Sequence, residues 1–260
     1  MPAKSRDVLT RPASAPDMVL RYGPRDDQVA DVRLPTRTGA PLVVLLHGGF
    51  WRAAWDRTHT RPMADELAAA GFAVATPEYA RTDGGGGWPT TFDDVALAVQ
   101  VIPTRIAAAV GEAVDPADRT VLVGHSAGGQ LALWCASRPL PTDYAGVVAL
   151  APVADLTEAD RLDLDTGAVR ELLGAGPDEA PDRYAFADPC RLPAPPVPVV
   201  VVHGLDDTSV PPALSRRYAT HAGAELRLLD GIGHFELIDP LSAAWPVVLD
   251  AIEGASTRRY

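Results

Sequence analysis

Short apolar runs alternate along this chain with segments whose apolar residues have helical spacing. Several runs are almost entirely aliphatic, as in Leu-Val-Val-Leu-Leu from Leu42 to Leu46. Such runs are typical of strands that are buried on both faces of a parallel sheet. We therefore expect strands at residues 19–22, 29–34, 42–47, 72–76, 120–124, 146–150, 197–203 and 225–229.

The segments between these runs predict helices. Apolar residues from Val95 to Val110 recur at steps of four and three, which places them on one helical face. Thr91 and Asp94 form a candidate capping pair at the start of this helix, and Pro103 predicts a kink or a break within it. Shorter helices are expected at 65–70, 211–221 and 241–253. Strands and helices in alternation indicate a doubly wound α/β sheet.

Two stretches depart from this alternation. Residues 1–16 contain several Pro and Ser breakers and are expected to form a loosely held, flexible N-terminal arm. Residues 152–196 are rich in Asp, Pro and Ala, and we expect them to form a small lid over one end of the sheet. Because this lid segment is too short and too polar for a second core, residues 17–260 are interpreted as a single domain.

The charge balance narrows the classes of partner. The chain has 23 Lys and Arg against 34 Asp and Glu, a net charge of −11, which argues against a nucleic-acid partner. Its apolar runs are far shorter than the roughly 20 residues of a membrane-spanning helix, and its first residues lack the apolar segment of a signal peptide. We expect a cytoplasmic protein that acts on a small molecule and not on a membrane, and a homodimer is compatible with the sequence.

The metal-binding and redox residue types are sparse. Cys135 and Cys190 are the only cysteines, and two thiols in a chain of this length are expected to be reduced. No cluster of residues has metal-ligand spacing, so we expect neither a metal nor another cofactor.

The first motif with chemical content is Gly124-His-Ser-Ala-Gly128, which has the form G-x-S-x-G. It follows a predicted buried strand and precedes a predicted helix. In this context the motif predicts a sharp strand–turn–helix elbow that exposes the hydroxyl of Ser126 above the sheet. Ser126 is therefore the candidate nucleophile.

A serine hydroxyl needs a base that accepts its proton, and His234 is the candidate. It follows the predicted strand 225–229 directly, so its side chain can reach back over the end of the sheet. The other histidines are assigned elsewhere: His59 and His221 to the surface, His203 to a structural role, His125 to the elbow but pointing away, and His47 to bracing a loop.

The base needs a carboxylate that fixes its tautomer. Asp206 and Asp207 lie together just after the predicted strand 197–203, and either one follows the serine and precedes the histidine in the chain. Asp155, after the preceding strand, is a third candidate. The chemistry of the residues alone leaves this choice open.

A fourth element follows the strand 42–47, in His47-Gly-Gly-Phe-Trp51. Backbone N–H groups of Gly49 and Phe50, together with the N–H of Ala127, would form an oxyanion hole. Trp51 and Trp88 are candidate substrate-binding residues, although each could instead pack against the protein.

These motifs together resemble the α/β-hydrolase superfamily over nearly the whole chain. His47-Gly-Gly-Phe-Trp51 is similar to the H-G-G-x-W motif of kynurenine formamidases (arylformamidases) and of related small bacterial carboxylesterases. The resemblance implies an α/β-hydrolase fold with an eight-stranded, mostly parallel sheet. It also implies that the triad acid lies in an Asp-x-x-Val-Pro run, here Asp207 to Pro211, which favours Asp207.

The resulting hypothesis is a metal-free serine hydrolase that cleaves a small carboxylic ester or an aryl formamide such as N-formylkynurenine. Its activity is expected to rise with pH, because only neutral imidazole accepts the serine proton. The alternatives are an exopeptidase-like or thioesterase-like hydrolase, and a hydrolase-fold protein that binds a small ligand without turnover.

Overall fold

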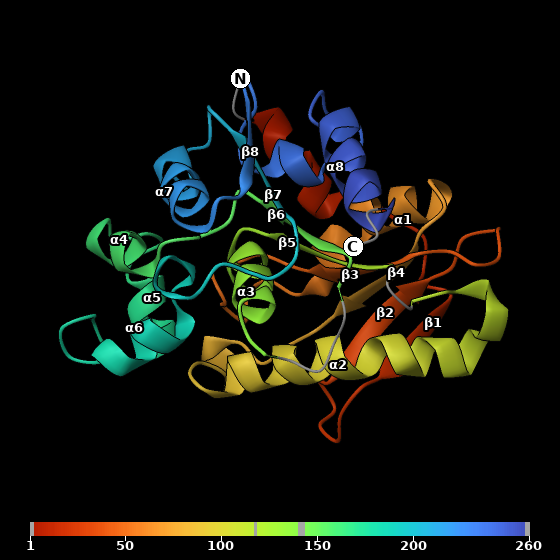
Figure 1. The fold of residues 1–260 in the computed structure, drawn as a ribbon, viewed down its shortest axis with the longest axis horizontal. Helices are drawn as coiled ribbons and strands as arrows, with labels where there is room; N and C mark the ends of the chain where they lie inside the picture. The colour runs from red at the N-terminus through yellow and green to blue at the C-terminus, as the bar shows by residue number, and fades with distance from the viewer. Residues whose placement is uncertain (1–2, 117–118, 140–143, 258–260) are drawn as a thin grey trace.

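An eight-stranded sheet forms the centre of the molecule (Figure 1). The computed structural model describes residues 3–116, 119–139 and 144–257. The strand order is β1-β2-β4-β3-β5-β6-β7-β8; two pairings at the β1 edge are antiparallel and the other five are parallel. The strands are β1 (Met18–Arg21), β2 (Val29–Arg33), β3 (Leu42–Leu46), β4 (Ala73–Pro77), β5 (Thr120–His125), β6 (Gly146–Leu150), β7 (Val199–Gly204) and β8 (Glu225–Leu229). All eight predicted strands are confirmed, with ends displaced by two residues at most.

Helices cover both faces of the sheet. Alternate residues of β3 point to opposite faces, so that Val44 and Leu46 join one apolar cluster while Val43 and Leu45 join the other. Figure 1 shows α2, α3 and α7 on one side and α1 and α8 on the other. The helices are α1 (Arg61–Ala69), α2 (Thr90–Val110), α3 (Ala127–Ala136), α4 (Leu156–Arg161), α5 (Ala168–Leu173), α6 (Pro181–Ala187), α7 (Pro212–Ala222) and α8 (Trp245–Thr257).

Helix α2 differs from its prediction in two respects. It continues through Pro103, so the expected break is absent. Thr91 and Asp94 do not cap it: the Thr91 hydroxyl donates to the carbonyl of Ala80, and the Asp94 carboxylate accepts the N–H of the same residue at 2.9 Å. Tertiary bonds to the chain after β4 therefore replace the local cap.

Residues 90–113 are also long and apolar enough, by length and composition alone, to cross a membrane. In this fold α2 instead packs on the sheet through a buried face that includes Phe92, Val99 and Ile106. About a third of its most apolar stretch is buried inside the protein.

The segment expected to form a lid carries α4, α5 and α6, which lie together at one end of the molecule (Figure 1). Val169, Leu172 and Tyr184 of these helices are buried in the same apolar cluster as α2 and α3. The segment is thus continuous with the main core and does not form a core of its own.

The N-terminal arm is docked, which corrects the expectation of a loosely held segment. Residues Ala3–Thr10 form a 3-10 helix, η1, and Val8 on it is 1% exposed. Arg11 forms an ion pair with Asp239, and the Ser14 hydroxyl donates to Asp65 at 2.7 Å. The burial of Val8 and the ion pair of Arg11 hold the arm against the rest of the protein, although its sequence contains several Pro and Ser residues.

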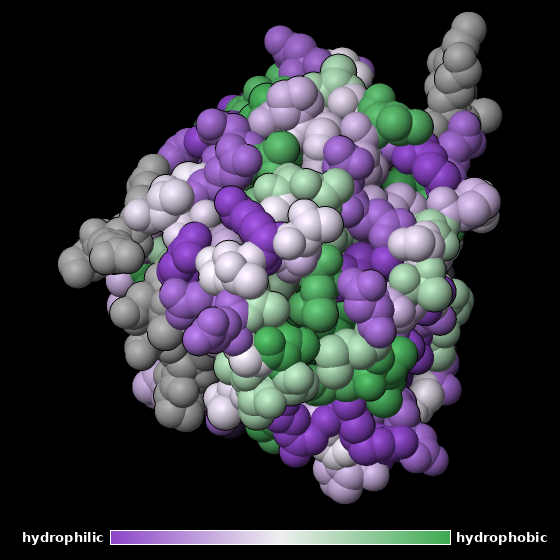
Figure 2. Space-filling view, turned by 90° about the vertical axis from the view of Figure 1, so that its right-hand side faces the viewer, coloured by the Kyte–Doolittle hydropathy of each residue, from purple (hydrophilic) through white to green (hydrophobic). Residues whose placement is uncertain are grey.

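The β1 edge of the sheet lies on the side shown in Figure 2. Apolar residues gather in the lower part of this face, with hydrophilic residues around them. Val19 on β1 is 56% exposed. Arg21, two residues further along the same short strand, adds a positive charge to this edge. Short, charged edge strands resist pairing with a second chain. The homodimer that the sequence allows stays a prediction.

We predict that Arg11→Met destabilises the fold by about 1 kcal/mol at pH 7, because it leaves the mostly buried Asp239 carboxylate unpaired. The hydrogen bond from Arg11 lowers the pKa of Asp239. A lowered folded-state pKa gives stability that is present above the usual carboxyl range near 4 and is lost as the pH falls through the folded value. The deficit of Arg11→Met should therefore shrink below about pH 4.

Urea unfolding at pH 7 and pH 3 measures this difference. Arg21→Met is the matched control and should cost almost nothing, because the partners of the Arg21 guanidinium are the fully exposed Asp26 carboxylate and the exposed carbonyl of Arg25. An equal loss in both variants would contradict the role given to Arg11.

Candidate active site

Ser126 stands at a sharp turn between β5 and α3. Its φ of 57° and ψ of −117° lie outside the regions that a residue with a side chain normally occupies. The turn is held by its own backbone, because the Ser126 N–H donates to the Leu150 carbonyl of β6 at 2.8 Å. This is the predicted elbow.

Two glycines make this turn sterically possible. A Cβ atom added to Gly124 would collide with the backbone of Gly128, and one added to Gly128 would collide with the carbonyl groups of Leu46 and His47. The backbones of β5, α3 and β3 can meet here only because neither position has a side chain. The glycines of the motif are thus required by contact between main chains.

Asp207 and His234 are joined as the resemblance implied. Asp207 Oδ2 accepts a hydrogen bond from His234 Nδ1 at 2.6 Å, and Asp207 Oδ1 accepts the N–H groups of Ser209 and Val210 at 2.8 Å each. His203 bonds to the same carboxylate through Nε2 at 3.1 Å, which confirms a structural role for that histidine.

The other two candidate acids are in different environments. Asp206 is exposed. Asp155 caps α4 by accepting the N–H of Glu158 at 2.8 Å, and it forms an ion pair with Arg217. Asp207 is therefore the one of these three carboxylates that contacts His234.

The environment of Asp207 keeps it ionised. Burial by itself would raise the pKa of this carboxyl, but the hydrogen bonds from His203 and His234 and the backbone N–H of Val210 lower the pKa far below its usual value. An ionised acceptor at Nδ1 holds the proton on that nitrogen and leaves Nε2 of His234 free to act as a base.

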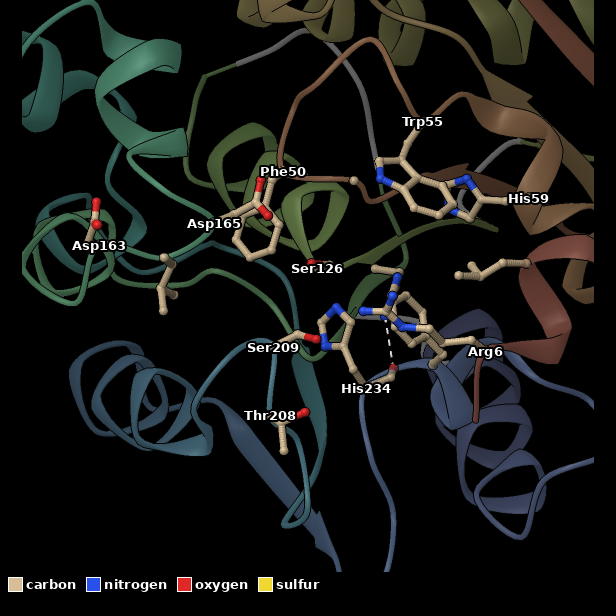
Figure 3. A pocket seen from close by; sticks show the side chains of 15 residues that line it. Arg6, Phe50, Trp55, His59, Ser126, Asp163, Asp165, Thr208, Ser209 and His234 are labelled. Atoms are coloured by element: carbon tan, nitrogen blue, oxygen red, sulfur yellow. Dashed lines mark hydrogen bonds between the residues drawn. The ribbon is translucent and has the colours of Figure 1, made fainter. Parts of the chain in front are cut away.

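Ser126 and His234 line one cavity, and Figure 3 shows the imidazole turned toward the serine hydroxyl. Within the described residues this hydroxyl makes no hydrogen bond to the imidazole.

The candidate oxyanion loop runs directly beside the nucleophile. A Cβ on Gly48 would lie 3.0 Å from that of Ser126, and Gly49 and Phe50 both have positive φ values, of 110° and 48°. In the described parts of the chain the N–H groups of Gly49, Phe50 and Ala127 have no hydrogen-bond acceptor. Gly49 and Phe50 line the same cavity as Ser126, and Ala127 follows Ser126 directly, so these three N–H groups remain the candidate oxyanion donors.

His47 braces this loop, as expected. Its Nε2 bonds to Glu78 at 2.9 Å and its Nδ1 to the carbonyl of Gly48 at 2.8 Å, while its ring stacks on Tyr79. The Tyr79 hydroxyl in turn donates to the His47 carbonyl at 2.8 Å.

His125 points toward the base, contrary to the expectation that it points away. Its Nε2 donates to the carbonyl of His234 at 3.1 Å, and the two ring centroids are 4.5 Å apart. Burial lowers the pKa of His125 well below its usual value, which favours the neutral ring. Through its hydrogen bond, His125 holds the backbone of the loop that carries His234.

The cavity in front of Ser126 has a volume of about 450 Å³. Phe50, Trp55 and Phe235 give it aromatic walls. His59 also lines it, although the sequence placed this residue at the surface; burial lowers the pKa of His59 to about 4. Only the folding of the oxyanion loop brings His59 here, and no local pattern signals it.

Two substrate-binding expectations are corrected. Trp51 is fully buried and donates its indole N–H to Gln130 at 3.2 Å, so it belongs to the core. Trp88 is 37% exposed but is not among the residues that line this cavity. It packs edge-on against Phe186 and lies under the guanidinium of Arg183, which attaches its loop to α6.

Across residues 3–116, 119–139 and 144–257, no group of three or more His, Cys, Asp or Glu side chains is placed to hold a metal ion. The residues that meet around Ser126 can form a nucleophile, a base, an acid that orients the base and a set of oxyanion donors. This combination suits acyl transfer.

Comparison with known proteins agrees with this geometry. A family model described as BD-FAE matches residues 30–221. No curated protein sequence matches the chain.

Several solved structures share the fold. A truncated carbohydrate esterase from gut microbiota is 19% identical, with a TM-score of 0.79 over 94% of this chain and 100% of that one. Esterase B from Lactobacillus rhamnosis is 18% identical (TM-score 0.76, 98% and 91% covered). A propionate-bound esterase from Thermogutta terrifontis is 20% identical (TM-score 0.70, 94% and 96% covered). These likenesses confirm the predicted α/β-hydrolase fold.

We predict that Gly128→Ala severely impairs the fold or abolishes activity, because its Cβ would collide with two backbone carbonyls that cannot move independently. Gly254→Ala is the matched control: that glycine lies in α8 with open space around it, and alanine favours the helix by up to about 1 kcal/mol. Thermal unfolding and ester hydrolysis measure both variants. Normal activity in Gly128→Ala would contradict the steric account of the elbow.

Proposed function

The chain belongs to the BD-FAE family of α/β-hydrolase-like esterases. We propose that it is a metal-free serine hydrolase that cleaves a small carboxylic ester or an aryl formamide. The observation that carries the proposal is the 2.6 Å bond between His234 and Asp207 beside a serine held on a strained elbow. Its proposed partner is a small molecule in the cytoplasm, with no nucleic acid or membrane involved.

The proposed reaction has two halves. The hydroxyl of Ser126 attacks the substrate carbonyl carbon while Nε2 of His234 takes the serine proton. The tetrahedral intermediate collapses when His234 returns that proton to the leaving alcohol or amine, which gives an acyl-enzyme. Water then attacks the acyl-enzyme, with His234 again accepting and returning a proton, and releases the acid.

The oxyanion donors supply the main electrostatic stabilisation. Negative charge develops on the carbonyl oxygen in each half, and the N–H groups of Gly49, Phe50 and Ala127 are the proposed donors. Each such donor is worth about 3 kcal/mol of the barrier in related chemistry. Because their dipoles are fixed before the substrate arrives, little reorganisation is required.

The aromatic walls support an aryl group as one half of the substrate. Phe50, Trp55 and Phe235 offer ring faces and edges to the cavity. The likeness of His47-Gly-Gly-Phe-Trp51 to the formamidase motif supports the same choice. An exopeptidase-like or thioesterase-like hydrolase would use the same residues, whereas a ligand-binding protein without turnover would not need the complete set.

We predict that Ser126→Ala removes nearly all turnover, by a factor of at least about 10⁴, without loss of the fold. It should also abolish covalent labelling by a fluorophosphonate. Ser137→Ala, at the other end of α3, is the control and should be labelled normally. Comparing N-formylkynurenine with p-nitrophenyl acetate separates formamidase from esterase activity. Labelling of Ser126→Ala at the wild-type rate would refute the proposal.

We predict that Asp207→Asn lowers kcat by about 10⁴, because an amide cannot hold His234 in the tautomer that accepts the serine proton. The neighbouring Asp206→Asn removes the same charge at an exposed position and should keep activity within about twofold. Steady-state kinetics on one ester tests the pair. Equal losses in both variants would show that Asp207 is not the triad acid.

A further inference from the structure

The docked N-terminal arm forms part of the candidate active site. Arg6 and Leu9 of η1 line the cavity that contains Ser126. Figure 3 shows Arg6 on one side of Ser126, whereas Asp163 and Asp165 of the lid segment lie on the other. The cavity therefore has Arg6 on one side of Ser126 and two carboxylates on the other, of which Asp165 is paired with Arg52.

Arg6 is exposed to solvent, and its guanidinium lies beside an aromatic ring of the loop that carries His234. Its guanidinium carbon lies 5.2 Å from the centre of the Phe235 ring, and Phe235 follows the candidate base His234 directly. Two residues further along η1, Val8 is buried in the core. The ion pair of Arg11 with Asp239 fixes the end of the arm.

The charge of Arg6 is not neutralised within the described residues, because none of them places a carboxylate against its guanidinium. Arg52, which also lies near the cavity, differs in this respect: it forms ion pairs with Asp165 and Glu171. Arg6 is also the one Arg or Lys among the described residues that line this cavity. In a chain of net charge −11, this unpaired guanidinium is a positive group that can attract and bind an anionic ligand.

The leaving group of the substrate belongs on the same side as Arg6. His234 must return a proton to the leaving oxygen or nitrogen, so that atom has to lie beside its imidazole. Phe235 continues the wall from His234, and Arg6 lies over its ring. A group extending from the leaving atom along this wall therefore reaches the guanidinium.

We propose that Arg6 determines specificity by binding a carboxylate on the alcohol or amine half of the substrate. The guanidinium edge can donate two parallel hydrogen bonds to a carboxylate while its face stays on Phe235. The inference rests on the proposed serine hydrolase function and names its substrate class: esters or formamides with an anionic leaving group. An aryl formamide that carries a carboxylate on its amine half, such as N-formylkynurenine, belongs to this class.

Matched acetate esters test the proposal. One series carries a carboxylate on the alcohol half (acetoxyacetate, 3-acetoxypropanoate, 4-acetoxybutanoate and 5-acetoxypentanoate). The other ends in a methyl group (ethyl, propyl, butyl and pentyl acetate). We expect the wild-type protein to prefer the anionic member of at least one pair, and Arg6→Met to lower kcat/KM for that ester about tenfold.

The loss should fall on KM, since a remote carboxylate binds equally in the ground and transition states. Arg6→Lys should keep part of the preference, because lysine keeps the positive charge but cannot donate two parallel hydrogen bonds to a carboxylate. Arg21→Met, which removes an arginine on β1, should behave as the wild-type protein does. Thermal unfolding of Arg6→Met at the wild-type temperature would show that the arm is still docked.

The outcomes separate the two proposals. If the wild-type protein hydrolyses neither series nor any formamide, the proposed function is wrong. If it hydrolyses the neutral esters but shows no anionic preference, or keeps that preference in Arg6→Met, the role of Arg6 is wrong. If Arg6→Met does not fold, inhibition of the wild-type protein decides: 4-hydroxybutanoate inhibiting no better than 1-butanol would overturn the inference.

Discussion

The main chains of β3, β5 and α3 touch one another around Ser126, and this contact determines where the rest of the site lies. It exists because Gly124 and Gly128 leave room that a single Cβ atom would fill. It also holds Ser126 at a φ of 57°, a conformation that costs about 1–3 kcal/mol for a residue with a side chain. Parallel strands end at the same edge, so the loops after β3, β7 and β8 reach the same point.

A second constraint is the burial of the acid. Removing Asp207 from water is costly, and the surrounding chain offsets that cost with hydrogen bonds from two imidazoles and two backbone N–H groups. The ionised carboxylate can then orient His234. His125 holds the same loop from the other side through its backbone carbonyl. Hydrogen bonds to both the side chain and the main chain of His234 thus fix its position.

The reacting groups and the substrate-contacting groups come from different parts of the molecule. The proposed nucleophile, base, acid and oxyanion donors all follow strands of the sheet. The outer walls of the cavity come from the N-terminal arm, with Arg6 and Leu9, and from the lid segment, with Asp163, Leu164 and Asp165. Under the proposed function, this division would let the reacting groups stay the same while the outer walls determine which substrates bind.

Local patterns were sufficient to find the strands and to name candidate residues for the reacting centre, because buried parallel strands and the serine elbow depend on short runs of residues. Choosing Asp207 over Asp206 required the family resemblance, and the fold then joined Asp207 to His234. Only the packed molecule could show that Trp51 is in the core, that His59 and Arg6 reach the cavity and that His125 supports the base. Those positions depend on contacts between segments far apart in the chain, for which no local spacing carries a signal.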